Sequence, residues 1–165
     1  ETCRGDQPLR EAIKQFLVLH PETEPQVHLV LQPEPPTINL DPSSMSRALY
    51  NLLDNAFKYT DTKTRKISCY SRIIKDKHGV KQYFEYEIRD NGIGISAENQ
   101  ETIFDEFVRV SESLKGVSGV GLGLGIARAI ADSHGGQLYV ESTVGEGSSF
   151  FLRVPLDITA SQENH

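Results

Sequence analysis

Hydrophobic residues along this chain recur with two different periods, which predict its helices and strands. Spacing of three to four residues predicts helices, and strict alternation predicts strands. In chain order, the patterns predict a helix at 8–19, strands at 26–32 and 37–40, a helix at 41–59, strands at 66–74 and 82–89, short helical turns at 96–107, a helix at 121–134, and strands at 137–141 and 148–155.

Turn and capping residues divide these elements. Asp41 and Pro42 supply a start signal for the helix at 41–59, and the pair Gly135-Gly136 supplies a stop signal for the last helix. The third and fourth strands flank a short charged turn, and the last two strands flank a glycine-bearing turn. Each of these pairs is therefore expected to form an antiparallel hairpin.

The helix at 41–59 has two chemically different faces. Asn51, Asn55 and Lys58 fall at i, i+4 and i+7 and form one polar stripe. The opposite face carries Met45, Leu49, Leu52, Leu53 and Ala56. Asparagine is a poor helix former, costing about 0.5 kcal/mol per residue. The stripe is either a solvated face or a site for a metal-bound phosphate, with asparagine oxygen as a hard ligand for Mg²⁺ and lysine as the counter-charge.

Two glycine-rich segments offer candidate ligand contacts. In residues 90–94, Asp90 ends a strand and two glycines let the backbone approach a flat ligand closely, although a capped turn explains the same pattern. Residues 119–125 precede a helix, so their amides offer an anion site. This segment lacks both the Lys-Ser/Thr ending of a P-loop and the G-x-G-x-x-G spacing, which leaves a glycine-rich lid over a phosphate chain.

Composition narrows the class of protein. With 165 residues, 38% of them hydrophobic, and a net charge of −6, the chain is expected to form one domain that does not bind nucleic acid nonspecifically. The two cysteines, Cys3 and Cys69, form no CxxC motif, and no apolar run approaches the ~20 residues of a membrane span. We expect a cytoplasmic chain without membrane contact of its own, which leaves open that it is the cytoplasmic part of a membrane-bound parent protein.

In this order, the motifs resemble those of the ATP-binding catalytic domain of sensor histidine kinases. This domain belongs to the GHKL superfamily, shared with gyrase, a heat-shock chaperone and MutL. The matching segments are the N box at 51–60, the first glycine box at 90–94, the phenylalanine box at 103–107, the second glycine box at 119–126 and the Gly-Ser-Ser-Phe ending at 147–150. Together they cover about residues 37–156.

The resemblance implies an α+β fold, the Bergerat fold. It is a two-layer α/β sandwich whose mixed, mostly antiparallel sheet is covered on one face by about three helices, with a mobile ATP lid at 108–118. Residues 1–165 would form a single domain with its core at about 26–156. Residues 1–20 would be an N-terminal helical segment and 157–165 a polar tail.

The resemblance also implies site residues for ATP and Mg²⁺. Asn55 would hold Mg²⁺ through its side-chain oxygen, Asp90 would accept the adenine amino group, and Arg109 would meet the terminal phosphate. The other implied contacts are Asn51 and Lys58 near the phosphates, Tyr59 beside the adenine, Gly92, Gly94 and Ile95 around the base, Gly119, Gly121, Leu122, Gly123 and Leu124 along the triphosphate, and Ser148 near the adenine waters. Core packing is the competing explanation for Tyr59, Phe104, Phe107, Leu122 and Leu124, and an exposed charge at the helix end is the competing explanation for Lys58.

The implied function is phosphoryl transfer from ATP to a histidine on a separate dimerisation hairpin, and then to a response regulator receiver domain. His20 is no acceptor, because Pro21 and Pro25 prevent a continuous helix there. This chain is therefore expected to contain no catalytic acceptor and to bind ATP with little turnover. Two alternatives remain, a non-transferring regulatory module and an ATP hydrolase; the amide of Asn51, where a hydrolase needs a carboxylate, argues against the hydrolase.

Overall fold

The computed structural model describes residues 1–104 and 120–156, with the backbone alone for 120–123. Its elements, in chain order, are β1 (Thr2–Arg4), α1 (Gln7–Leu19), the 3₁₀ helix η1 (Pro21–Gln26), β2 (Val27–Val30), β3 (Thr37–Asn39), α2 (Pro42–Lys58), β4 (Ile67–Lys75), β5 (Lys81–Asp90), α3 (Ala97–Gln100), α5 (Val120–Ser133), β6 (Gln137–Thr143) and β7 (Gly147–Pro155). None of the helices in these ranges is both long enough and apolar enough to cross a membrane.

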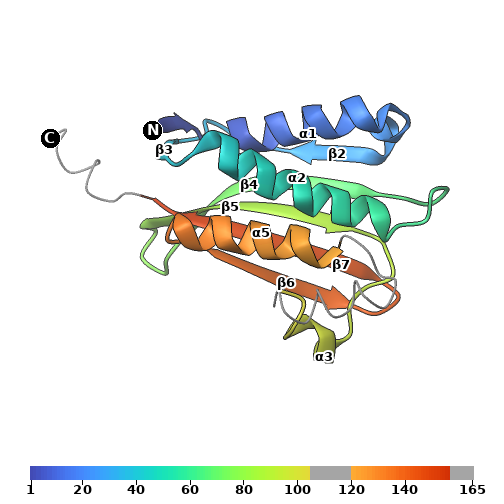
Figure 1. Ribbon diagram of the computed structural model, residues 1–165. Helices are drawn as coiled ribbons and strands as arrows, with labels where there is room; N and C mark the ends of the chain where they lie inside the picture. The colour runs from blue at the N-terminus through green and yellow to red at the C-terminus, as the bar shows by residue number, and fades with distance from the viewer. Residues whose placement is uncertain (105–119, 157–165) are drawn as a thin grey trace, which may run out of the picture.

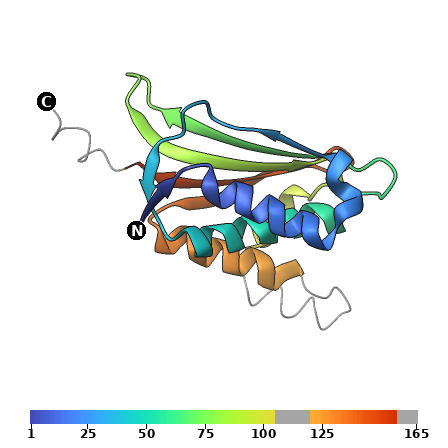
Figure 2. The ribbon, with the colours of Figure 1, turned by 90° about the horizontal axis from the view of Figure 1, so that it is seen from above.

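Five strands form the main sheet, in the order β2-β4-β5-β7-β6. Strand β2 runs parallel to β4, and every other neighbouring pair is antiparallel. Helices α1, α2 and α5 lie side by side on one face of this sheet (Figures 1 and 2). The predicted two-layer sandwich with a mixed, mostly antiparallel sheet is confirmed, including both hairpins.

The hydrophobic core lies between the helices and the sheet. All five apolar residues of the predicted α2 face are buried in it, so that prediction is confirmed. From the sheet, the core receives Ile67, Phe84, Tyr86, Ile88 and Leu152. Because α2 presents its apolar face to the sheet, its asparagine stripe points away from the centre of the core.

Both predicted helix signals work as expected. The Asp41 side chain accepts hydrogen bonds from backbone N–H groups in the first turn of α2. After α5, Gly135 has a φ of 68°, and Gly136 N donates to Ala131 O over 2.9 Å. This pattern is a Schellman cap. His134, at the end of α5, accepts a hydrogen bond from Asp41 N through its Nε2 over 3.0 Å, so the end of α5 is tied to the start of α2.

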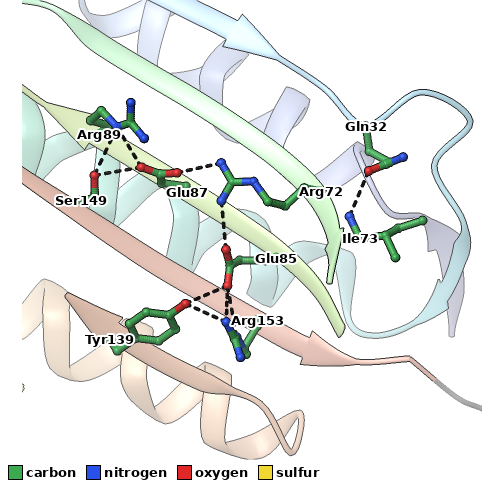
Figure 3. Close-up of polar contacts among 9 residues, drawn as sticks. All are labelled: Gln32, Arg72, Ile73, Glu85, Glu87, Arg89, Tyr139, Ser149 and Arg153. Atoms are coloured by element: carbon green, nitrogen blue, oxygen red, sulfur yellow. Dashed lines mark hydrogen bonds and ion pairs between the residues drawn. The ribbon is translucent and has the colours of Figure 1, made fainter. Parts of the chain in front are cut away.

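Strand β2 is shorter than the strand predicted at 26–32. Gln26 belongs to η1. Beyond Val30, hydrogen bonds that involve side chains take the place of backbone pairing with β4. The Gln32 Oε1 accepts Ile73 N over 3.0 Å, as Figure 3 shows, while Gln32 N donates to Ser71 Oγ over 3.0 Å. The backbone N–H and the side-chain oxygen of Gln32 therefore replace the strand pairing predicted for the residues after Val30.

The helix-free face of the sheet holds two nearly fully buried carboxylates, Glu85 and Glu87 (Figure 3). Arg72 donates to one oxygen of each, over 2.9 and 2.7 Å. The remaining oxygen of Glu85 accepts from Arg153 and Tyr139, and that of Glu87 accepts from Arg89 and Ser149. Burial alone would raise the pKa of Glu87, but hydrogen bonds from Arg72, Ser149 and Arg89 outweigh it and hold the pKa below its usual value.

Glu87→Gln should therefore destabilise the fold in a pH-dependent way. A depressed folded pKa contributes stability that is present above the ordinary carboxyl pKa and lost as pH falls through the folded value. We expect a loss of about 1–3 kcal/mol in unfolding free energy at pH 7, shrinking in acid, measured by urea unfolding across pH. Glu141→Gln, on an exposed residue of β6, is the control. A Glu87→Gln difference that stays constant with pH would contradict the assignment.

Candidate functional site

Asp90 is the last residue of β5 and lies between two neighbouring strands. Its register partners are Ile67 in β4 and Ser148 in β7. The side chain accepts Gly92 N at Oδ1 over 2.8 Å, and the residue is 8% exposed. No ion pair joins it to any residue of 1–104 or 124–156. Burial raises the pKa of Asp90, and N–H donors from Gly92 and Ser148 partly offset this rise.

The two glycines after Asp90 are required by close contacts with protein backbone. A Cβ on Gly92 would lie 2.3 Å from Tyr59 O, and a Cβ on Gly94 would lie 2.2 Å from Thr143 O. Gly94 also has a φ of 76°. The sequence predicts that these glycines let a ligand approach. In the structure, their lack of a side chain lets the turn pack closely between the end of α2 and the end of β6.

A second layer of hydrogen bonds supports this turn. Ser142 Oγ accepts Ile95 N over 2.7 Å, donates to Gly147 O over 2.8 Å and lies 2.7 Å from Ser148 Oγ. Gln100 donates to the carbonyl oxygens of Ile95 and Ser142. Ser142 and Gln100 are absent from the residues predicted for the site, and nothing in the periodicity points to them, because their hydrogen bonds link turns and strand ends that follow no helical or strand period.

Asn55 is the buried member of the α2 stripe. It is 7% exposed, and its side-chain amide makes no hydrogen bond with any residue whose side chain the structure describes. Asn51, one turn earlier, is half-buried. The Asn55 amide is not among the fully enclosed, unpartnered polar groups of the described side chains, so it stays accessible. An accessible amide oxygen without a described partner fits a hard cation such as Mg²⁺ or another polar group of a ligand.

Lys58 forms an ion pair at the end of α2, its Nζ 2.9 Å from Asp54 Oδ2. The two side chains are 41% and 31% exposed, and such surface pairs are worth about 0–1 kcal/mol. The i, i+4 spacing of these two residues is the sequence signal for this pair. Because the pair is weak, Lys58 can exchange Asp54 for a phosphate at little cost.

The end of the sandwich that holds Asp90 also receives the start of α5. Helices α2 and α5 run antiparallel, so the α5 N-terminus lies near the C-terminal turn of α2 in both views (Figures 1 and 2). Gly121, Leu122 and Gly123 belong to the first turns of α5, which begins at Val120. The first N–H groups of a helix have no partner within it and attract anions.

The remaining predicted residues divide into two groups. Arg109, Gly119, Phe107 and the proposed lid at 108–118 lie outside the described residues. Leu124 is buried in the core, and Phe104 packs edge-on against Phe150 at 6.2 Å, as the core alternative predicts. Tyr59 is half-buried, and its carbonyl oxygen accepts Ile93 N over 3.2 Å. The Leu124 side chain is therefore a core residue, and only its backbone could reach a nucleotide.

Comparison with known proteins identifies the family. Residues 40–158 match the family described as histidine kinase-, DNA gyrase B-, and HSP90-like ATPase. The chain belongs to this ATPase family. The family match, the fold and the relatives together make it an ATP-binding catalytic domain of the sensor histidine kinase type. The resemblance drawn from the sequence motifs is thus confirmed.

The relatives of this ATPase domain are sensory kinases. It is 37% identical over 121 residues to the adaptive-response sensory kinase SasA of Synechococcus sp. (strain JA-2-3B'a(2-13)), covering 73% of this chain and 30% of the relative. It is 33% identical over 146 residues to SasA of Prochlorococcus marinus (strain MIT 9303), covering 88% of this chain and 38% of the relative. The chain thus spans about a third of the length of these curated relatives.

Solved structures share its fold. The catalytic domain of histidine kinase ThkA superposes with a TM-score of 0.70 at 25% identity, covering 94% of this chain and 98% of that one. The mycobacterial sensor histidine kinase MprB gives a TM-score of 0.70 at 24% identity, covering 94% of this chain and 97% of that one. The Bergerat-type architecture implied by the resemblance is therefore confirmed.

Proposed function

We propose that this ATPase domain binds Mg²⁺-ATP and positions its γ-phosphate for transfer to a histidine on a dimerisation hairpin of the parent protein. The observation that carries this proposal is the gathering of three features at one end of the sandwich. These are the buried carboxylate of Asp90 without a described cation, the amide of the largely buried Asn55 without a described partner, and the N-terminus of α5. Phosphoryl transfer depends mainly on positioning and on charge neutralisation, which such a site can supply.

Three side chains carry distinct roles in this proposal. Asp90 accepts a hydrogen bond from the exocyclic amine of adenine, the only donor on that edge of the base. Asn55 holds Mg²⁺ through its amide oxygen, and the ion would neutralise phosphate charge when bound. Lys58 leaves Asp54 for a phosphate oxygen, and Arg109 meets the terminal phosphate.

The other proposed contacts surround these three. They are Asn51 at the metal or phosphates, Tyr59 beside the base, Gly92, Gly94 and Ile95 around it, Gly119, Gly121, Leu122, Gly123 and the backbone of Leu124 along the triphosphate, and Ser148 near the adenine. Ser148 is buried next to Asp90, which supports its place at the base.

The proposal extends to the setting of the domain. We assign the next step of the relay to a response regulator receiver domain, and the site of action to the cytoplasm. Two observations support the latter: the match to an ATPase family, and the free, buried thiols of Cys3 and Cys69. We also propose that residues 1–165 act as a single domain, which agrees with one core cluster running from Cys3 to Val154.

Calorimetric titration with a nonhydrolysable ATP analogue, with and without Mg²⁺ and against GTP, tests the binding step. Saturable, adenine-selective, Mg²⁺-assisted binding is expected, and a folded sample that binds no nucleotide would refute it. Incubation with labelled ATP and a histidine hairpin supplied as a separate polypeptide tests transfer. Label on the hairpin supports the kinase assignment, whereas binding without transfer to any supplied hairpin indicates a regulatory module.

Asn55→Ala should remove the contribution of Mg²⁺ to nucleotide affinity. The variant loses the amide oxygen but keeps the helix, because alanine is the best helix former. We expect the affinity for Mg²⁺-ATP to fall about tenfold or more, the loss of one charge-assisted ligand contact, while the affinity in EDTA stays unchanged. The EDTA titration is the internal control. An equal Mg²⁺ effect in both proteins would remove Asn55 from the metal site.

A further inference from the structure

Arg65, in the loop between α2 and β4, is a buried cation with an unusual set of partners. It is 7% exposed, and none of the ion pairs among the described side chains involves it. Its Nε donates to Thr60 Oγ1 over 2.7 Å, and one Nη donates to Phe57 O and Thr60 O over 3.1 and 3.3 Å. Burying a guanidinium is costly unless its donors are satisfied, and here backbone and hydroxyl oxygens satisfy those on Nε and on one Nη.

These contacts complete the C-terminal end of α2. The last carbonyl groups of a helix have no partner within it. Arg65 satisfies Phe57 O directly, and it holds Thr60, whose hydroxyl donates to Ala56 O over 2.8 Å. The guanidinium also lies over the Phe57 ring, 4.1 Å from its centroid. A cation at the negative end of a helix dipole is favourable, so Arg65 fixes where the chain leaves α2.

The same turn carries the wall of the proposed base pocket. Tyr59, between the two residues that Arg65 grips, accepts Ile93 N at its carbonyl oxygen. From the other side, Asn91 accepts Lys66 N over 2.9 Å and donates to Thr64 O over 2.8 Å. Hydrogen bonds therefore connect three segments to one another: the end of α2, the loop that contains Arg65, and the glycine turn that follows Asp90.

We propose that Arg65 is a positioning residue that sets the base selectivity of the nucleotide site by fixing the α2 end against the turn at 90–94. It touches no nucleotide itself and acts through Tyr59 O and the glycine turn. The inference rests on the proposed function, because it assumes that Asp90 reads the base. Without Arg65, the turn can shift by fractions of an ångström, enough to misalign a hydrogen bond between Asp90 and adenine.

The ratio of the dissociation constants for GTP and ATP separates this role from simple stabilisation. Partial unfolding weakens the apparent binding of both nucleotides by the same factor, so it leaves the ratio unchanged. For the full chain with Arg65→Met, we expect the preference for ATP to fall about three- to tenfold, the effect of misaligning one hydrogen bond. Arg65→Lys keeps the positive charge but loses the planar, multiply donating guanidinium. Its preference for ATP should lie between that of Arg65→Met and that of the unsubstituted chain.

Arg153→Met is the matched control, because it removes another networked arginine, on the helix-free face of the sheet. It should lower stability and keep the nucleotide ratio. A parent-like ratio in Arg65→Met would overturn the proposal, and if that variant does not fold, a parent-like ratio in Arg65→Lys overturns it instead. If the unsubstituted chain does not discriminate ATP from GTP, the proposed function is refuted. This separate outcome is visible before any substitution is made.

Discussion

Asp90→Asn should lower the affinity for ATP about a hundredfold, a loss of about 2.7 kcal/mol. The Asp90 Oδ1 accepts Gly92 N, so an asparagine here keeps its oxygen on that donor and points its NH₂ group toward the base. Adenine presents an amine at that ring position, and two donors would then face each other. Guanine presents a carbonyl oxygen there, so the affinity for GTP should stay constant or rise.

Parallel titrations with the ATP analogue and with GTP measure this exchange of preference. Asp41→Asn is the control, since it makes the same chemical change at a helix cap where asparagine serves equally well. An Asp90→Asn protein that still prefers ATP as strongly as its parent would show that the base is read elsewhere.

The pH dependence of ATP binding should report the same carboxylate. Burial raises the pKa of Asp90 above its ordinary 3.8, and the adenine amine donates a stronger hydrogen bond to the ionised form. Affinity should therefore fall as pH drops through this raised pKa, with proton release on binding, and Asp90→Asn should remove that part of the profile. In the absence of nucleotide the sign for folding is opposite: the group favours the folded state at low pH and opposes it above its folded pKa.

Gly147→Ala should destabilise the protein by at least about 3 kcal/mol. Gly147 has a φ of 121°, which alanine rarely adopts, and a Cβ there would lie 2.1 Å from Asp90 O. The two strands must separate at the residue that ends β5, so nucleotide binding should weaken as well. Urea unfolding measures the stability.

Gly145→Ala offers a matched control two residues away in the same turn. Gly145 has a φ of 86°, and a Cβ on it meets nothing within 4 Å. The Gly145→Ala variant should lose only the cost of placing alanine in the left-handed region, about 1–2 kcal/mol of unfolding free energy. Equal losses of unfolding free energy in the two variants would show that the contact with Asp90 contributes nothing.

Those parts of the fold that depend on local pattern are readable from the sequence. The two faces of α2, its Asp41 cap, the Schellman cap of α5 and both antiparallel hairpins follow from residue spacing and turn chemistry. Strand β1 does not, because three residues are too few to show alternation, and it exists only through its pairing with β3. The early end of β2 depends on the Gln32 side chain finding β4, which no local pattern reveals.

The same distinction, between residues with a local sequence pattern and residues without one, applies to the candidate site. Asn55 and Asp90 stand out from spacing alone, one on a helical stripe and one at a strand end before glycines. Arg65, Ser142 and Gln100 carry no such signal, because their hydrogen bonds link loops and turns and follow neither the helical nor the strand period. The polar alternation of β5 is visible in the sequence, but the pairing of Glu85 and Glu87 with arginines from β4 and β7 depends on strand register.

Three glycines in and near the site press against main-chain oxygens: Gly92 on Tyr59, Gly94 on Thr143 and Gly147 on Asp90. A carbonyl oxygen is the same atom in every residue type, so these contacts place no demand on the side chains of Tyr59 or Thr143. Thr143 can therefore accept many substitutions without moving the turn, whereas each glycine can accept almost none. Libraries randomised at Thr143 and at the three glycines should retain diversity at Thr143 and recover glycine at the other three positions.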